Sequence, residues 1–217
     1  MGLFGWLFGK RERVASRDVI CLSDAARMNG VTKAIDSHLA AGRPVLVLAH
    51  FPTTLAAFGE HLMRPDRPYA AIPSALTPRA ALELATAGPQ VLFGLVQNLR
   101  PDEFPPDETA PPCPLAVIVL ERHFLRTHDE RVAKFTAGLG GTTPDFHVSL
   151  DDPLMAMFAG EWVANTLRRL GMEENQTVES EMVSRRIRAA QAKIATSNPT
   201  DHEADSPAEW LERNRAG

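Results

Sequence analysis

Histidines and carboxylates are the residues of this sequence best suited to chemistry, and none of them forms a complete catalytic constellation. His123 and His128 lie close to Asp129, but a zinc site would need a further ligand that the sequence does not nominate, so surface or capping roles are favoured. His50 and His61 have no carboxylate pair near them at ligand spacing. We therefore predict no catalytic, cofactor-binding or metal-binding residues and expect the protein to act by binding.

Phosphate-binding loops do not occur in their usual forms. A Walker A loop needs glycine, four residues and then Gly-Lys-Ser/Thr after a strand. Residues 5–11 read GWLFGKR, with the wrong spacing, no hydroxyl and no strand before them. Asp151 and Asp152 precede Pro153, where we expect them to serve the start of a helix through its dipole and free N–H groups.

Composition and charge exclude several classes of protein. The 217 residues are 44% hydrophobic and 23% charged, as in an ordinary soluble globular domain. A formal net charge of −4 argues against a nucleic-acid binder, which is usually basic. Cys21 and Cys113 make no disulfide framework and fit a reducing compartment, and no apolar run approaches the roughly 20 residues of a membrane-spanning helix. We expect a cytoplasmic protein.

The N-terminus places aromatic residues before basic ones, whereas a secretory signal places its charge first. One interpretation is a weak peripheral contact with the inner face of the membrane, made by an apolar and a basic set: Leu3, Phe4, Trp6, Leu7 and Phe8, then Lys10, Arg11 and Arg13. The alternative is a frayed start that packs on the domain or has no fixed structure.

Short apolar runs bounded by turn residues predict strands that are buried on both faces. The runs occupy residues 44–50, 69–72, 91–96, 115–120 and 146–150. Residues with helical spacing separate these runs, and Ser23 and Thr77 are suited to cap the first turns of two helices. Strands alternating with helices predict an α/β fold with a parallel sheet covered on both faces.

The chain divides by pattern into four parts. They are a basic amphipathic segment (1–18), the α/β domain (19–152), a helical extension (153–196) and a polar tail (197–217). The domain begins with two helices, over 23–28 and from 31 to 42, with Asn29-Gly30 between them. The extension holds one helix up to Gly171 and a longer one over 180–195, and Trp210 predicts a short docking helix in the tail. Six prolines make residues 101–114 a loop or an insert without fixed structure.

Several segments, in order, resemble SecA, the motor ATPase of the bacterial preprotein translocase. The run FHVSLDDPLM at 146–155 is similar to the family's strand that ends in Ser-Leu-Glu/Asp-Asp before a helix beginning Leu-Met. Residues 115–123, which end in Glu-Arg-His, and residues 41–47, AGRPVLV, match two further strands. The resemblance covers roughly residues 31–195 and implies the second RecA-like domain of SecA with the start of its helical scaffold.

The departures from the family pattern fall on the loops that would face nucleotide. The family's arginine-rich stretch, which reaches the γ-phosphate, corresponds to residues 134–142, where no arginine occurs and Lys134 cannot reproduce the bidentate fork. The family's Ala-Gly-Arg-Gly-Thr-Asp motif corresponds to residues 94–102, GLVQNLRPD, which lack its glycines after Gly94. The Walker-bearing domain is absent, so the resemblance implies no ATP binding without a partner domain.

The resemblance therefore implies a non-catalytic, SecA-like accessory factor linked to preprotein translocation, with SecA, the translocon or an unknown chain as partner. The candidate interface residues are Glu121, Arg122, His123, Arg185, Arg186 and Arg188; fold maintenance is an equal alternative for them. A second hypothesis is one half of a two-chain ATPase, completed by a Walker-bearing partner, with Arg122 or Arg126 as its arginine. A third is a membrane-surface or small-molecule binder using the N-terminal aromatic residues.

Overall fold

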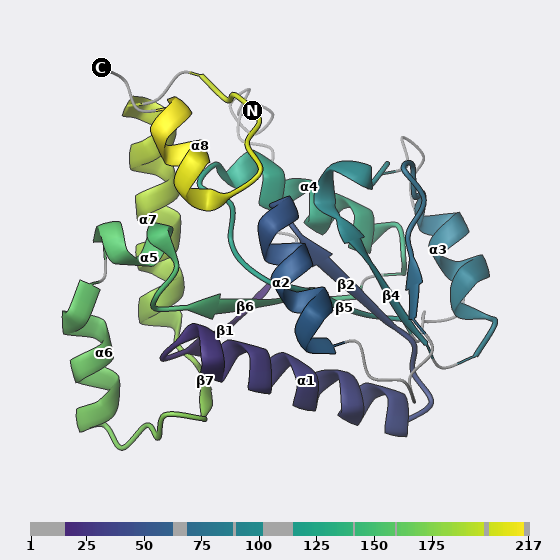
Figure 1. The fold of residues 1–217 in the computed structure, drawn as a ribbon, viewed down its shortest axis with the longest axis horizontal. Coiled ribbons are helices and arrows are strands. Elements are labelled where there is room, and N and C mark those ends of the chain that lie inside the picture. The colour runs from purple at the N-terminus through teal and green to yellow at the C-terminus, as the bar shows by residue number, and fades with distance from the viewer. Residues whose placement is uncertain are drawn as a thin grey trace, which may run out of the picture.

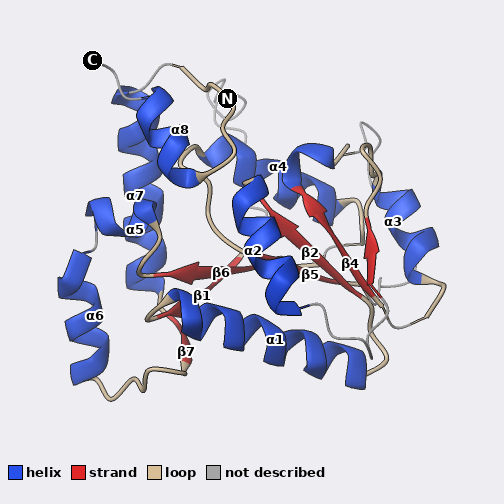
Figure 2. Ribbon diagram, viewed as in Figure 1, coloured by secondary structure: helices blue, strands red, loops and turns tan. Residues whose placement is uncertain are grey.

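A mostly parallel sheet forms the centre of the molecule (Figures 1 and 2). The computed structural model describes residues 16–62, 69–88, 90–101, 115–140, 142–158, 160–197 and 200–214. Within them the sheet has seven strands in the order β3-β4-β2-β5-β6-β1-β7. All neighbours are parallel except β1 and β7. The strands are β1 (Arg17–Cys21), β2 (Val45–Ala49), β3 (Tyr69–Ala71), β4 (Val91–Leu95), β5 (Ala116–Val119), β6 (Asp145–Ser149) and β7 (Thr177–Glu179).

Helices cover both faces of this sheet. In β2, Val45 and Val47 pack in one apolar cluster with residues of α1 and α2, whereas Leu46 and Leu48 pack in another with residues of α3, α4 and α7. The strand is therefore apolar at every position because each face meets helices. The helices are α1 (Asp24–Ala40), α2 (Pro52–Leu62), α3 (Pro78–Ala85), α4 (Arg126–Ala137), α5 (Pro153–Phe158), α6 (Gly160–Arg169), α7 (Glu181–Ser197) and α8 (Pro207–Asn214), with a short 3₁₀ helix η1 (Val96–Asn98).

The expected α/β class, with helices on both faces and a C-terminal helical extension, is confirmed. Each of the apolar runs predicted to be a strand forms one, and Ser23 and Thr77 cap α1 and α3 by accepting the Ala26 and Ala80 N–H groups. Trp210 lies in the predicted short helix, α8, and is 1% exposed.

The prediction of two helices over residues 23–42 is wrong, because α1 runs unbroken through Asn29 and Gly30. A Cβ atom at Gly30 would lie 2.9 Å from Thr177 Cγ2. Glycine is therefore required here by the close approach of α1 to β7, at a conformational cost that the packing offsets.

Two further features were not predicted. Strand β1 begins at Arg17, within the segment assigned to the N-terminus, and β7 adds an antiparallel edge beside it. The single helix expected up to Gly171 corresponds to α5 and α6, and Ala159 between them lies outside the described residues. Residues 1–15 and 102–114 lie outside the described part of the chain, and with them the proposed membrane contacts Phe4, Trp6, Phe8, Lys10 and Arg11. No helix in the described part is long and apolar enough to cross a membrane.

Candidate functional site

The carboxyl edge of the sheet brings together polar residues from distant parts of the sequence. His50 follows β2, η1 follows β4, and Glu121, Arg122 and His123 follow β5. These strands are adjacent and parallel, so the loops after them meet at one edge. This edge is the usual place for ligands in open α/β sheets.

Asp129, in the first turn of α4, is the hub of this edge. Its Oδ1 accepts the His123 N–H at 3.1 Å and lies 3.0 Å from His50 Nε2. Its Oδ2 accepts from Gln191 Nε2 at 2.7 Å and from Arg122 Nη1 at 3.3 Å. Burial alone would raise the pKa of Asp129, but Arg122, His50 and Gln191 hold it well below its ordinary value. The carboxylate is therefore ionised and joins α4, α7 and two loops.

Glu121, Arg122 and His123 are held inside the fold. Glu121 and His123 are 3% and 4% exposed, and the Arg122 side chain is 10% exposed. Arg122 Nε donates to Asp18 at 2.7 Å, and its guanidinium lies 3.5 Å from the centre of the Phe146 ring. Contacts of this kind are those of fold maintenance, and a partner could not reach Glu121 or His123 in this conformation.

A histidine cluster lies beside the hub. The His123 ring centre is 5.3 Å from that of His50 and 3.8 Å from that of His128, and His128 Nε2 lies 2.7 Å from Asp201 Oδ2. Burial, together with the neighbouring His50 and His128, lowers the pKa of His123 well below its usual value. The ring is therefore neutral near pH 7.

His123, His128 and Asp201 each offer a ligand atom within 4.8 Å of the others, so their donor set could suit a metal ion such as zinc. The geometry argues against it. His123 Nδ1 accepts the Leu125 N–H at 3.0 Å, whereas a metal-bound histidine normally donates from its second nitrogen. The His123 and His128 rings are tilted by 36° to each other. A hydrogen-bonded cluster is the better description.

A basic cavity of about 850 Å³ opens next to the cluster. It is lined by η1 and the residues after it, by one face of α4, and by the C-terminal tail: Gln97, Asn98, Leu99, Arg100, Pro101, Thr127, Arg131, Lys134 and Glu203. Residues 97–101 of one loop expected to face nucleotide and Lys134 of the other both contribute to it. Arg100 Nη1 donates to Gln97 O at 2.6 Å, and Arg131 Nη1 donates to the same oxygen at 3.4 Å.

The arginines of this cavity were not found from the sequence. Arg122 and Arg126, which were nominated, line a smaller cavity of about 220 Å³ beside α7 instead. Arg131 lies one helical turn before Lys134 in α4, and that spacing was the signal that could have found it.

The prediction that Asp151 and Asp152 serve the start of α5 is wrong for their carboxylates, which accept hydrogen bonds from other groups. Asp151 Oδ2 accepts the Asp24 N–H at 3.0 Å, so it serves the N-terminus of α1. Asp152 Oδ1 accepts from Arg27 at 2.6 Å, and its Oδ2 accepts the Ser149 N–H at 2.9 Å. The pair therefore ties the end of β6 to α1.

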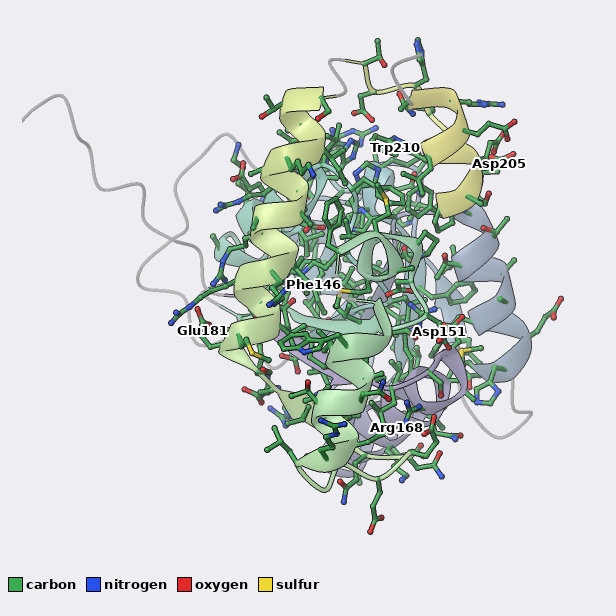
Figure 3. The ribbon with its side chains drawn as sticks, turned by 90° about the vertical axis from the view of Figure 1, so that its left-hand side faces the viewer. Phe146, Asp151, Arg168, Glu181, Asp205 and Trp210 are labelled. Carbon is green, nitrogen blue, oxygen red and sulfur yellow. The ribbon has the colours of Figure 1, made fainter. Side chains whose placement is uncertain are left out.

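A second candidate surface lies on α5, α6 and α7, which face the viewer in Figure 3, with Glu181 at the start of α7 and Arg168 near the end of α6. It exposes large apolar side chains: Met157, Trp162, Leu170 and Met182. Trp162 is 54% exposed and has the Arg186 guanidinium 4.6 Å above its ring. Arg185 and Arg188, also nominated, lie on the same helix and contact Glu181.

His147 gives the fold a predicted dependence on pH. It is 3% exposed, its Nδ1 has no hydrogen-bond partner among the described residues, and burial lowers its pKa to about 4. In the unfolded chain a histidine has a pKa of ~6.5, so the unfolded state binds the proton more readily than the folded state does. The contribution of His147 to stability is therefore lost as pH falls from about 6.5 to 4. In this range we expect the free energy of unfolding of His147→Leu to fall less steeply with decreasing pH than that of the unaltered chain, by up to ~1.4 kcal/mol per pH unit.

Urea denaturation at a series of pH values measures this effect. His61→Leu is the control, because His61 is exposed and its surroundings change little on unfolding. An unchanged pH profile in His147→Leu would show that the imidazole is not held neutral by burial.

The sequence of this chain is similar to those of protein translocase subunits. No protein-family model matches the chain. The protein translocase subunit SecA of Koribacter versatilis is 43% identical over 86 residues, which are 39% of this chain and 9% of that one. SecA of Sulfurovum sp. is 26% identical over 187 residues (84% of this chain, 21% of that one), and SecA of Stenotrophomonas maltophilia is 26% identical over 220 residues (86% and 24%).

Among solved structures, the C-terminal part of the Fun30 ATPase domain is similar with a TM-score of 0.41 and 10% identity, over 78% of this chain and 54% of that one. The chain spans about a quarter or less of the length of the SecA proteins that it matches. The resemblance expected from its motifs is confirmed: over most of its length the chain is SecA-like.

Proposed function

We propose that this chain is a non-catalytic SecA-like domain that binds a protein partner of the translocation machinery through α5, α6 and α7. The observation that carries the proposal is Trp162, 54% exposed beneath the Arg186 guanidinium. Tryptophan and arginine are the residue types most enriched where protein interfaces concentrate their binding energy. Large apolar side chains exposed on these neighbouring helices also favour an interaction site.

The charges around Trp162 support a protein partner with carboxylates. Arg168 and Arg169 end α6, and Arg185, Arg186 and Arg188 follow one another along α7. Among the described residues, Glu174 pairs with Arg168, and Glu181 pairs with Arg185 and Arg188. An acidic partner surface would pair with this rim while the indole is buried, which would give both orientation and affinity.

The nucleotide-facing loops support the non-catalytic part of the proposal. Residues 94–102 lack the family's glycines after Gly94, and residues 134–142 contain no arginine. To transfer a phosphoryl group without a partner chain, the protein would also need a Walker loop, which the sequence lacks.

Trp162→Ala is expected to weaken binding to purified SecA of the same organism by roughly 30-fold, the effect of losing ~2 kcal/mol at an interface hot spot. Isothermal titration calorimetry of the full chain with SecA measures it. Leu84→Ala is the matched control, because Leu84 is an exposed apolar residue on α3, away from this surface. Equal affinities for the two variants would refute the proposed surface, and no binding by the unaltered chain would refute SecA as the partner.

One observation favours a second candidate, half of a two-chain ATPase. Arg100, Arg131 and Lys134 line the same cavity, so cations could still reach the phosphates of a nucleotide held by a partner with Walker motifs. Under this alternative, mixing the chain with such a partner raises the ATPase rate, and Arg131→Ala abolishes the increase while Arg126→Ala, outside the cavity, leaves it. No stimulation on mixing would exclude it.

A further inference from the structure

The tail folds into a compact unit, residues 201–214, here named the C-terminal segment. Hydrogen bonds within it close the loop before α8: Trp210 Nε1 donates to Asp201 at 3.1 Å, Arg213 to Glu203 O at 2.6 Å, and the His202 N–H to Asn214 at 2.7 Å. Ser206 caps α8 by accepting the Glu209 N–H at 3.1 Å. The segment therefore has its own network of polar contacts, largely independent of the rest of the domain.

Among the described residues, few polar contacts join the segment to the body of the domain. Asp201 Oδ2 lies 2.7 Å from His128 Nε2, and the Asp205 carbonyl accepts from the Thr53 N–H at 3.0 Å and from its hydroxyl at 2.9 Å. Thr53 belongs to the first turn of α2, where helical N–H groups lack partners within the helix. Figure 3 shows Asp205 and Trp210 together at the end of the molecule opposite Arg168.

Trp210 is the apolar anchor of the segment. Its ring stacks on Phe124 with 4.7 Å between centres and an angle of 8°, and the edge of His123 meets it at 5.4 Å. Both rings that contact Trp210 belong to the body of the domain, where Phe51 stacks on His123 with 5.3 Å between ring centres. One indole held between aromatic rings, with polar contacts around it, is an arrangement that peptide-binding interfaces also use.

Charge complementarity accompanies the anchor. The segment carries five carboxylates and one guanidinium: Asp201, Glu203, Asp205, Glu209 and Glu212, with Arg213. Its Glu203 lines the basic cavity together with Arg100, Arg131 and Lys134. Cations of the body thus lie near Glu203 of this acidic segment, and aromatic rings of the body contact its Trp210.

We infer that the surface beneath the C-terminal segment is a docking site for acidic, tryptophan-anchored helices, which the chain's own C-terminal segment occupies and which a partner segment of the same chemistry can take over. The inference goes beyond the surface of α5 to α7 and does not depend on it. Because the resident segment is tethered, it must first undock, and this equilibrium weakens the apparent affinity for any incoming segment.

A labelled peptide of residues 200–214 is the probe, and fluorescence anisotropy measures its binding to the full-length chain. We expect Trp210→Ala in the chain to raise the affinity for the peptide tenfold or more over the unaltered chain, because the resident segment no longer competes. A peptide that carries alanine in place of its own tryptophan should not bind. Leu84→Ala in the chain is the control, because Leu84 is an exposed apolar residue on α3, and this variant should behave as the unaltered protein does.

Far-ultraviolet circular dichroism establishes that Trp210→Ala remains folded. If it does not, Asp201→Ala replaces it, since this variant removes the contacts to His128 and Trp210 without removing the indole. A folded variant that binds the peptide no better than the unaltered chain would overturn the inference. Equal binding of the tryptophan-free peptide would overturn it too, because charge alone would then explain the docking.

Discussion

Replacing Asp129 with alanine is expected to lower the free energy of unfolding by about 3–5 kcal/mol, the range for breaking a buried charge pair. The Asp129 side chain is 5% exposed and accepts from Arg122, Gln191 and the His123 N–H. Alanine would leave Arg122 Nη1 and the His123 N–H without this acceptor, and Arg122 and Gln191 would keep their contacts to Asp18 and His123 O. Urea denaturation at pH 7 measures the loss.

Glu130→Ala is the control for Asp129→Ala, because Glu130 is the next residue and its side chain, 43% exposed, pairs with Arg126 at the surface. It should cost less than ~1 kcal/mol. The difference between Asp129→Ala and the unaltered chain should also shrink in acid. The depressed pKa of Asp129 gives stability that is present above ~4, the usual pKa of an aspartate, and is lost as pH falls below that value. A cost near that of Glu130→Ala at pH 7 would contradict the role of Asp129 as the hub.

Replacing Trp210 with alanine is expected to cost about 3 kcal/mol of local stability, at the lower end for a large buried aromatic side chain. Trp210 is 1% exposed and stacked on Phe124. The segment has few polar contacts to the body, so the loss should release α8 without unfolding the sheet. Hydrogen exchange followed by mass spectrometry should therefore show fast exchange in α8 and at Thr53, with β2 and β5 still protected.

Trp162→Ala serves as the control in the exchange experiment, because Trp162 is half-exposed and should leave the protection of α8 unchanged. If Trp210→Ala removed protection from β2 and β5 as well, α8 would be an integral part of the core, and the C-terminal segment could not be a replaceable occupant.

Helices and strands whose local sequence has a characteristic pattern could be predicted from the sequence. Strands β2, β4 and β5 are short apolar runs between turn residues, and α3 begins with a cap followed by proline. Strand β1 has no such signature, because Arg17 and Asp18 begin it. The position of β1 in the sheet is set by its parallel pairing with β6 and by the ion pair between Arg17 and Asp145.

The site was only partly predictable for a related reason. The resemblance to SecA singled out Glu121, Arg122 and His123, but their partners come from remote positions, such as Asp18 in β1 and Gln191 in α7. Local sequence does not reveal that a charge will be buried by residues far along the chain. Arg100 and Arg131 were missed because the cavity that they share exists only once η1 lies beside α4.

Titration of magnesium-ATP into the isolated chain tests the non-catalytic proposal most directly. Isothermal titration calorimetry should give no saturable heat up to millimolar nucleotide, because the loops over residues 94–102 and 134–142 lack the family's phosphate-contacting residues and no Walker loop is present. Saturable binding with micromolar affinity, weakened by Arg131→Ala, would contradict the account and make the basic cavity a nucleotide site.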